Sequence, residues 1–249
     1  MDDATREKIE TLKSWIDESG QGKVVFFGGA GVSTESGIPD FRSQDGLYNL
    51  KYKYPPEQII SRTFFDIKPD EFYEFYCDRM IVADAQPNAA HRYLAQLESE
   101  GKLSAVITQN IDGLHQLAGS KNVLELHGST LRNYCMKCNA FHSVDDLLKA
   151  REKSADGIPR CECGGIIKPD VVLYEEALDG DILQASVRAI AQAELMIVAG
   201  TSLVVHPAAG LIDYFGGKHL VIINLSPTPR DKQADLCIEA KIGEVFGNL

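Results

Sequence analysis

The chain has 249 residues, 44% of them hydrophobic, and a formal net charge of −11 with a pI near 5.0. This length is enough for one sizeable α/β core with a smaller lobe. The acidic charge repels phosphate groups and so disfavours nucleic-acid binding; it suits basic peptide partners or serves solubility alone. No apolar run approaches the roughly 18 residues of a membrane span, and residues 1–7 do not resemble a signal peptide. We therefore expect a cytoplasmic protein that binds neither nucleic acid nor membrane.

Short apolar runs separated by helical patterns predict a parallel, doubly wound (Rossmann-like) α/β sheet. Each run is apolar at consecutive positions, as strands covered on both faces are. Small or hydrogen-bonding residues follow each run, and in such sheets ligands bind beyond the carboxyl ends of the strands. The expected elements are a helix over 5–18, a strand over 24–27, a helix over 88–99, a strand over 105–107, a helix over 180–192, a strand over 195–198, a helix over 206–215 and a strand over 220–223.

Two insertions interrupt this alternation. Residues 43–83 are rich in aromatic residues and helical in pattern in their second half, and residues 128–170 contain four of the six cysteines. We therefore expect a Rossmann-like domain made of 1–42, 84–127 and 171–249. The helical insertion 43–83 and the cysteine module 128–170 would form the smaller lobe.

The cysteine module contains two close pairs, Cys135-x2-Cys138 and Cys161-x-Cys163. In an intracellular protein such pairs indicate a metal site before a disulfide framework. Four thiolates suit a closed, tetrahedral zinc site of the structural kind, so we expect one zinc ion bound by Cys135, Cys138, Cys161 and Cys163. His142 is an alternative ligand; a redox pair or unrelated cysteines are further alternatives.

A glycine-rich loop follows the first strand. Glycines there let backbone N–H groups approach a pyrophosphate closely. The pattern alone is weakly specific, because it is not G-x-G-x-x-G and a glycine loop is often a tight turn. The loop reads Gly29-Ala30-Gly31-Val32-Ser33-Thr34-Glu35-Ser36-Gly37-Ile38-Pro39-Asp40-Phe41-Arg42.

This loop is one of four blocks that resemble the sirtuin family of NAD-dependent protein lysine deacylases. The others are Thr-Gln-Asn-Ile-Asp-Gly-Leu-His at 108–115, His-Gly-Ser at 127–129 and Gly-Thr-Ser-Leu-Val-Val-His-Pro-Ala-Ala at 200–209. The blocks occur in the family's order, with the cysteine module among them. The resemblance implies NAD as cofactor and acyl-lysine proteins or peptides as substrates. It also implies deacylated lysine, nicotinamide and O-acyl-ADP-ribose as products.

The resemblance also implies which residues bind the cofactor. Phe41 would close over the nicotinamide ribose, and Asp112 would accept a hydrogen bond from the nicotinamide amide. Asp112 is equally well placed to cap a helix. The implied cofactor-binding residues are Gly29, Ala30, Gly31, Thr34, Asp40, Phe41, Arg42, Gln109, Asn110, Ile111, Asp112, His127, Gly200, Thr201, Ser202, Asn224 and Leu225.

His127 is the expected catalytic base, and Asn110 is the second expected catalytic residue. A histidine near its ordinary pKa can accept a hydroxyl proton at neutral pH. In the family's chemistry the acyl oxygen attacks the nicotinamide ribose, nicotinamide leaves, and the histidine then activates the ribose hydroxyls. Without the resemblance, a lone histidine at a strand end would be interpreted as structural.

A segment after the cysteine module is expected to bind the substrate peptide as an added strand. The family commonly has Phe-Gly-Glu where this chain has Tyr174-Glu175-Glu176. The extra carboxylate would favour basic residues beside the lysine, and the alternative is an ordinary buried strand. The expected substrate-binding residues are Val171, Val172, Leu173, Tyr174, Tyr76 and Arg79.

Tyr76 and Arg79 are the residues expected to influence which acyl chain is removed. With Phe72 and Phe75 they fall on one face of a helix expected over 70–81, and an arginine on an apolar face needs an anionic partner. The Tyr-x-x-Arg spacing resembles family members that remove succinyl or malonyl groups. However, those members often have Ala where this chain has Thr34, and an acidic residue of this chain could itself pair with the arginine.

Two other functions fit the same scaffold. One is a mono-ADP-ribosyltransferase, in which a protein nucleophile takes the ribose. The other is a binding module that senses NAD without catalysis. Intact Asn110 and His127 favour deacylation over both.

Overall fold

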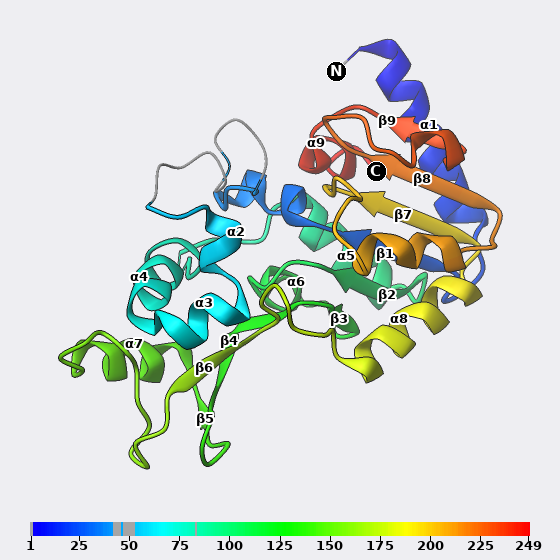
Figure 1. Ribbon diagram of the computed structural model, residues 1–249. Helices are drawn as coiled ribbons and strands as arrows, with labels where there is room; N and C mark the ends of the chain where they lie inside the picture. Colours follow the sequence, from blue (N-terminus) through cyan, green and yellow to red (C-terminus); the bar gives the residue numbers. More distant parts are fainter. Residues whose placement is uncertain (1, 42–45, 47–52, 83) are drawn as a thin grey trace.

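The computed structural model describes residues 2–41, 46, 53–82 and 84–249. In this part of the chain a six-stranded sheet has the order β3-β2-β1-β7-β8-β9, and a separate three-stranded sheet has the order β5-β4-β6 (Figure 1). Every pairing in the larger sheet is parallel, which confirms the predicted Rossmann-like sheet. Its strands are β1 (Val24–Gly28), β2 (Leu103–Thr108), β3 (Val123–Glu125), β7 (Leu195–Ala199), β8 (His219–Ile223) and β9 (Leu236–Ile238).

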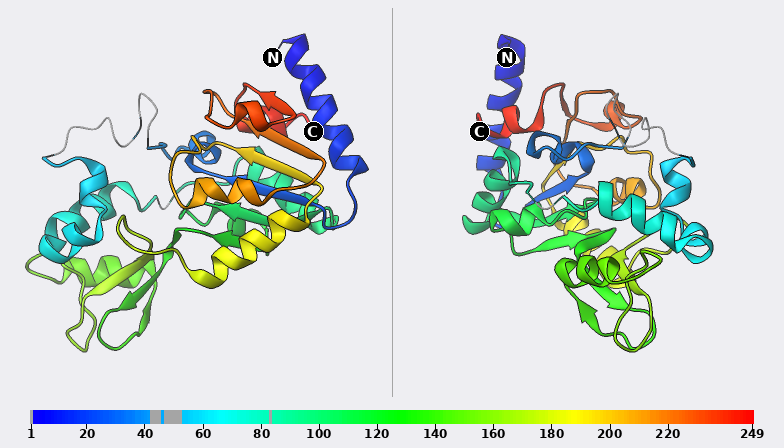
Figure 2. Two further views of the ribbon diagram at one scale, coloured as in Figure 1. Left: turned by 45° about the vertical axis from the view of Figure 1, so that its right-hand side comes forward. Right: turned by 90° about the vertical axis from the view of Figure 1, so that its left-hand side faces the viewer.

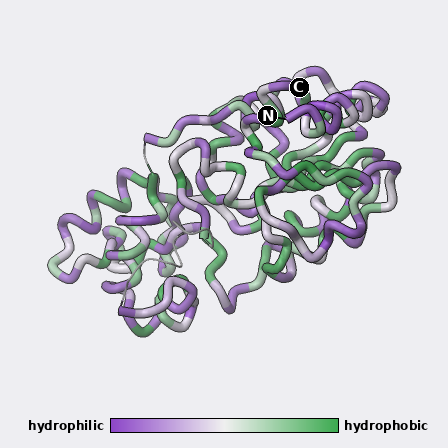
Figure 3. Tube along the Cα trace, turned by 90° about the horizontal axis from the view of Figure 1, so that it is seen from above, coloured by the Kyte–Doolittle hydropathy of each residue, from purple (hydrophilic) through white to green (hydrophobic). Residues whose placement is uncertain are grey.

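Helices cover both faces of the larger sheet, which is why its strands are apolar at consecutive positions. In β1, Val24 and Phe26 pack toward one layer, whereas Val25 and Phe27 pack toward the other. Hydrophobic residues concentrate in these strands, whereas the helices around them mix hydrophilic and hydrophobic residues (Figure 3). The first layer contains α1 (Asp3–Glu18), α5 (Ala89–Ser99) and α9 (Ile242–Phe246), and the second contains α8 (Gly180–Gln192) and η4 (Ala208–Tyr214).

Two expectations about the larger sheet need correction. The helix expected over 206–215 is a 3-10 helix, η4, which contains Gly210, a residue type that disfavours the interior of a regular α-helix. The edge strand β9 was not among the expected strands. No described helix combines the length and apolarity needed to cross a membrane.

The smaller lobe contains the two insertions (Figure 2), which pack on each other through one hydrophobic cluster. Phe65 and Phe72 of the helical insertion lie in this cluster with Leu147 and Ile167 of the cysteine module. Strand β6 crosses the boundary predicted between residues 170 and 171, where the cysteine module was expected to end. The division into domains remains a proposal. The elements are α2 (Pro56–Ile59), α3 (Arg62–Ile67), α4 (Pro69–Arg79), β4 (Gly128–Cys135), β5 (Phe141–His142), α7 (Val144–Glu152) and β6 (Ile167–Val171), with the short α6 (Leu114–Ala118) following β2.

Candidate functional site

A cleft of about 1150 Å³ lies at the carboxyl ends of the parallel strands and reaches into the smaller lobe. Because β1, β2, β7 and β8 run in the same direction, the segments that follow them meet at this edge. Arg42 lies outside the described residues, and Tyr76 is not among those that line the cleft. The sequence-predicted residues that line it are Gly29, Ala30, Gly31, Thr34, Asp40, Phe41, Arg79, Gln109, Asn110, Ile111, Asp112, His127, Val171, Val172, Leu173, Tyr174, Gly200, Thr201, Ser202, Asn224 and Leu225.

The glycine loop after β1 packs its backbone directly against the loop after β7. The N–H of Gly31 donates to the carbonyl of Gly200 at 2.8 Å. A Cβ on Gly31 would lie 2.7 Å from the Cα of Gly200, and Gly200 itself has a φ of 60°. Neither position therefore accepts a side chain. Main-chain atoms without side chains line the cleft here, which lets a pyrophosphate approach the backbone closely.

Ser33 links the glycine loop to the segment after β2. The amide Nδ2 of Asn110 donates to Ser33 Oγ at 3.1 Å, and Ser33 Oγ donates to Asp112 Oδ2 at 2.6 Å. The other oxygen, Oδ1, accepts from the N–H of Leu114, the first residue of α6, at 2.9 Å. The N-cap of α6 is Gly113, so Asp112 supports the start of the helix without being the N-cap considered as the alternative. Ser33 was not predicted as a site residue, although it lies within the recognised loop.

His127 has a defined proton position. Its Nδ1 lies 3.0 Å from the carbonyl oxygen of Gln109. A carbonyl only accepts hydrogen bonds, so Nδ1 carries the proton and Nε2 of the neutral ring is left as an acceptor. Burial lowers the pKa of His127 from its ordinary value, and the Gln109 carbonyl opposes this in part. The ring is therefore a base at neutral pH.

Gly128 fixes the position of His127 relative to the smaller lobe. It pairs with Val171 of β6, and a Cβ on it would lie 1.9 Å from the carbonyl oxygen of Asp170. Directly beyond this pair, the N–H of Val172 donates to the carbonyl of His127 at 3.0 Å. The predicted base is thus attached through its main chain to the predicted substrate segment.

The four predicted zinc ligands converge. Their sulfur atoms all lie within 4.8 Å of one another, with 3.4 Å between Cys135 and Cys163 and 3.7 Å between Cys138 and Cys161. Tetrahedral zinc, with zinc–sulfur bonds of about 2.3 Å, needs sulfurs about 3.8 Å apart. The tetrad therefore fits one structural zinc ion.

The single residue between Cys161 and Cys163 does not prevent this arrangement. Gly164 takes a φ of 81°, and a Cβ on Gly165 would lie 2.6 Å from Cys135 Sγ, so the two glycines make the tight turn possible. The alternative ligand His142 is not in the group found among the described residues.

Comparison with known proteins identifies the family. The profile of the Sir2 family matches residues 29–207. This chain belongs to the Sir2 family. An NAD-dependent protein deacetylase of Clostridium acetobutylicum is 58% identical over 96% of this chain and 97% of its own length. One from Clostridium perfringens is 54% identical over 98% of both chains.

Solved Sir2 structures agree over nearly the whole chain. The complex "Sir2-p53 peptide-NAD+" has a TM-score of 0.86 and 40% identity, covering 96% of this chain and 95% of that one. Sir2Tm bound to a propionylated peptide has a TM-score of 0.85 and 40% identity, covering 96% of each chain. The predicted sirtuin resemblance is therefore confirmed.

This Sir2 chain departs from the family's Phe-Gly-Glu string at Glu175. That residue has a φ of 76°, a left-handed conformation that glycine adopts without strain. The carboxylate of Glu175 accepts from the N–H of Thr63 at 2.8 Å in the first turn of α3. Next to it, the backbone of Tyr174 donates to Ile60 and accepts from Arg62. The substrate segment is thus anchored to the helical insertion along one side.

The two residues predicted to contact the acyl chain separate in space. Arg79, at the end of α4, lines the cleft. Tyr76 is fully buried, stacked on Phe72 with ring centroids 5.6 Å apart, and its hydroxyl has no hydrogen-bond partner among the described residues. Burial raises the pKa of Tyr76, so this phenol stays neutral.

Proposed function

We propose that this Sir2 chain is an NAD-dependent protein lysine deacetylase that yields free lysine, nicotinamide and O-acetyl-ADP-ribose. The observation that carries the proposal is the His127 ring, which keeps Nε2 as an acceptor in the same cleft as the bare-backbone glycine loop. Relatives of matched length are NAD-dependent protein deacetylases. A solved Sir2 chain binds both a peptide and NAD+.

The residues around the cleft fit NAD, which supplies the ADP-ribose that accepts the acyl group. The backbone of the glycine loop would bind the pyrophosphate. Asn110, oriented by Ser33, would bind the nicotinamide ribose. Asp112 would accept from the carboxamide, since a carboxylate oxygen accepts more than one hydrogen bond.

His127 would then act as general base. Its Nε2 takes the proton of a ribose hydroxyl, while the bond from Nδ1 to Gln109 keeps the ring in one orientation and one tautomer. The main chain of Gln109, which provides this carbonyl, is itself held, because its N–H donates to the carbonyl of Gly28 at 3.0 Å. The base is therefore oriented before substrate binds.

The pKa of His127 sets the expected pH dependence. Only the neutral ring can accept a proton, so activity should be lost as the pH falls through the pKa of this ring. Because burial lowers that pKa from its ordinary value of 6.5, the midpoint of the acidic limb should lie below pH 6.5. It is measured from kcat/KM of NAD-dependent deacetylation between pH 5 and 8, which reports the pKa in the free enzyme. A midpoint above pH 7 would contradict the assignment.

The substrate class is acyl-lysine in a peptide or protein. Solved Sir2 chains bind an acetylated peptide and a propionylated one. The peptide would add as a strand beside Val172 and Leu173. The cytoplasmic location remains a prediction.

Removal of succinyl or malonyl groups is a second candidate activity, and the position of Arg79 in the cleft favours it. Arg79→Met should lower kcat/KM on a succinyl-lysine peptide about tenfold more than on the matched acetyl-lysine peptide, because only succinyl presents a carboxylate to the guanidinium. Arg188→Met, on the exposed face of α8, serves as the control. Equal losses on both peptides, or no wild-type activity on succinyl-lysine, would remove this candidate.

The direct test of the main proposal is nicotinamide release from NAD with an acetyl-lysine peptide. We expect release that depends on the peptide, in equal amount to the free lysine formed. A folded, zinc-containing protein that binds NAD and releases none would favour the sensor, and transfer of ADP-ribose to the peptide would favour the transferase.

A further inference from the structure

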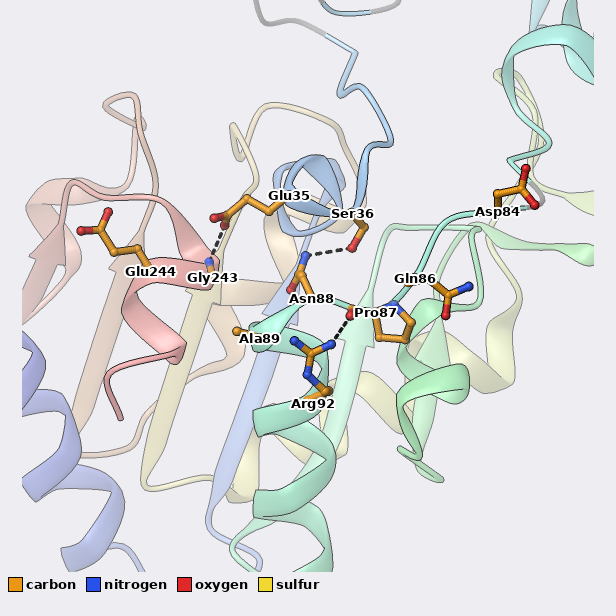
Figure 4. A pocket seen from close by; sticks show the side chains of 10 residues that line it. All are labelled: Glu35, Ser36, Asp84, Gln86, Pro87, Asn88, Ala89, Arg92, Gly243 and Glu244. Atoms are coloured by element: carbon orange, nitrogen blue, oxygen red, sulfur yellow. Dashed lines mark hydrogen bonds between the residues drawn. The ribbon is translucent and has the colours of Figure 1, made fainter.

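The outer side of the glycine loop, away from the cleft, rests on the start of α5. A second pocket of about 680 Å³ lies there, lined by α5, by η2 (Thr34–Ser36) and by α9 (Ile242–Phe246) (Figure 4). Asn88, the N-cap of α5, is buried in this wall with its side chain directed at the loop. Asn88 does not line the cleft, so it would not touch a ligand bound there.

The two ends of the Asn88 amide have different roles. Its Oδ1 accepts from the N–H of Ala90 at 3.0 Å and so caps α5. Its Nδ2 donates to the carbonyl of Val32 at 2.7 Å and to Ser36 Oγ at 3.0 Å. Val32 and Ser36 lie on either side of Ser33, which Asn110 and Asp112 hold from within the cleft. The loop is therefore held from both sides.

A pair of buried histidines supports Asn88. Its backbone N–H donates to Nδ1 of His91 at 3.2 Å, so the neutral His91 ring carries its proton on Nε2. The His91 ring lies 4.6 Å from the ring of His115, centroid to centroid. Burial lowers the pKa of His91 to about 4 and that of His115 to about 3, so both are neutral at pH 7. Since His115 belongs to α6, whose first N–H donates to Asp112, this support connects both sides of the loop.

We propose that Asn88 is a positioning residue for NAD: its amide holds the glycine loop in the shape that binds the cofactor, without contacting the cofactor itself. The proposal rests on the proposed function, in that NAD is the ligand. The energetic reason is the buried carbonyl of Val32, which would lose its donor and leave its position if Nδ2 were removed.

Asn88→Asp separates the two roles. Asp caps helices as well as Asn, but it presents an oxygen where Nδ2 donates to the Val32 carbonyl. We expect Kd for NAD, measured by titration calorimetry without peptide, to rise about tenfold. KM for NAD should rise in parallel, whereas KM for the acetyl-lysine peptide and the zinc content should not change. Asn88→Ser, which retains the cap but is too short to reach the loop, should change Kd in the same direction.

Asp179→Asn is the matched control, because it makes the reciprocal exchange at the N-cap of α8 and should leave Kd for NAD unchanged. Unchanged NAD binding in both Asn88 variants would overturn the proposal. An equal weakening of NAD binding and of peptide binding, accompanied by a lower Tm, would also overturn it, because that result would indicate a merely structural residue. A wild type that binds no NAD would contradict the proposed function as well, which distinguishes the two failures.

Discussion

Replacement of His127 by Ala should lower kcat of NAD-dependent deacetylation by about 10²- to 10⁴-fold, the usual contribution of a general base. The reason is the fixed tautomer: Nδ1 is committed to the carbonyl of Gln109, so Nε2 is the one ring atom able to take the hydroxyl proton. Asn110 and the glycine loop do not depend on this side chain for their own hydrogen bonds. NAD binding should therefore persist in the variant.

The measurement is the rate of free-lysine formation from an acetyl-lysine peptide, together with Kd for NAD. His219→Ala is the matched control, because that imidazole stacks on Trp15 with ring centroids 3.9 Å apart at the opposite end of β8 from the cleft. It should retain wild-type kcat. A His127→Ala variant that keeps activity within tenfold of wild type would show that another group is the base.

Replacement of Cys135 by Ser should abolish stoichiometric zinc binding and lower Tm by about 10 °C or more, because structural zinc contributes folding free energy directly. Cys135 ends β4, the central strand of the smaller sheet. The N–H groups of Cys138 and Lys137 also lower the pKa of its thiol, which favours the thiolate. Loss of the metal would therefore loosen β6 and the substrate segment that follows it.

Zinc content is measured by mass spectrometry of the purified protein, and Tm by calorimetry. Cys237→Ser is the control, since Cys237 lies on the edge strand β9 and outside the metal-binding group; it should keep one zinc ion and nearly the wild-type Tm. A Cys135→Ser protein that retains both zinc and Tm would exclude the four-cysteine site.

Sequence alone predicted the larger sheet because strands that are buried on both faces are apolar at every position, as runs 24–27 and 195–198 are. It also predicted the location of the cleft, since parallel strands bring their carboxyl ends to one edge. The short β9 was not predicted. In η4 the pattern is helical apart from Gly210, so the 3-10 form could not be told from an α-helix in advance.

The site was harder to predict where tertiary contacts determine which residues bond to one another and which reach the cleft. Ser33 lies in the recognised loop, but its bonds to Asn110 and Asp112 depend on the pairing of β1 with β2. Helical periodicity places Tyr76 and Arg79 on one face, yet packing against Phe72 buries the first while the second reaches the cleft. Spacing could not decide between His142 and four cysteines, because a ligand set depends on how the turns fold.

Deacetylation at this cleft is tested most sharply by the identity of the products when the zinc-containing protein is incubated with NAD and an acetyl-lysine peptide. Mass spectrometry should show the peptide losing its acetyl group, with nicotinamide and O-acetyl-ADP-ribose formed in equal amounts. A peptide that instead gains ADP-ribose, or one that stays unchanged although NAD is bound, would contradict deacetylation as the function of this cleft.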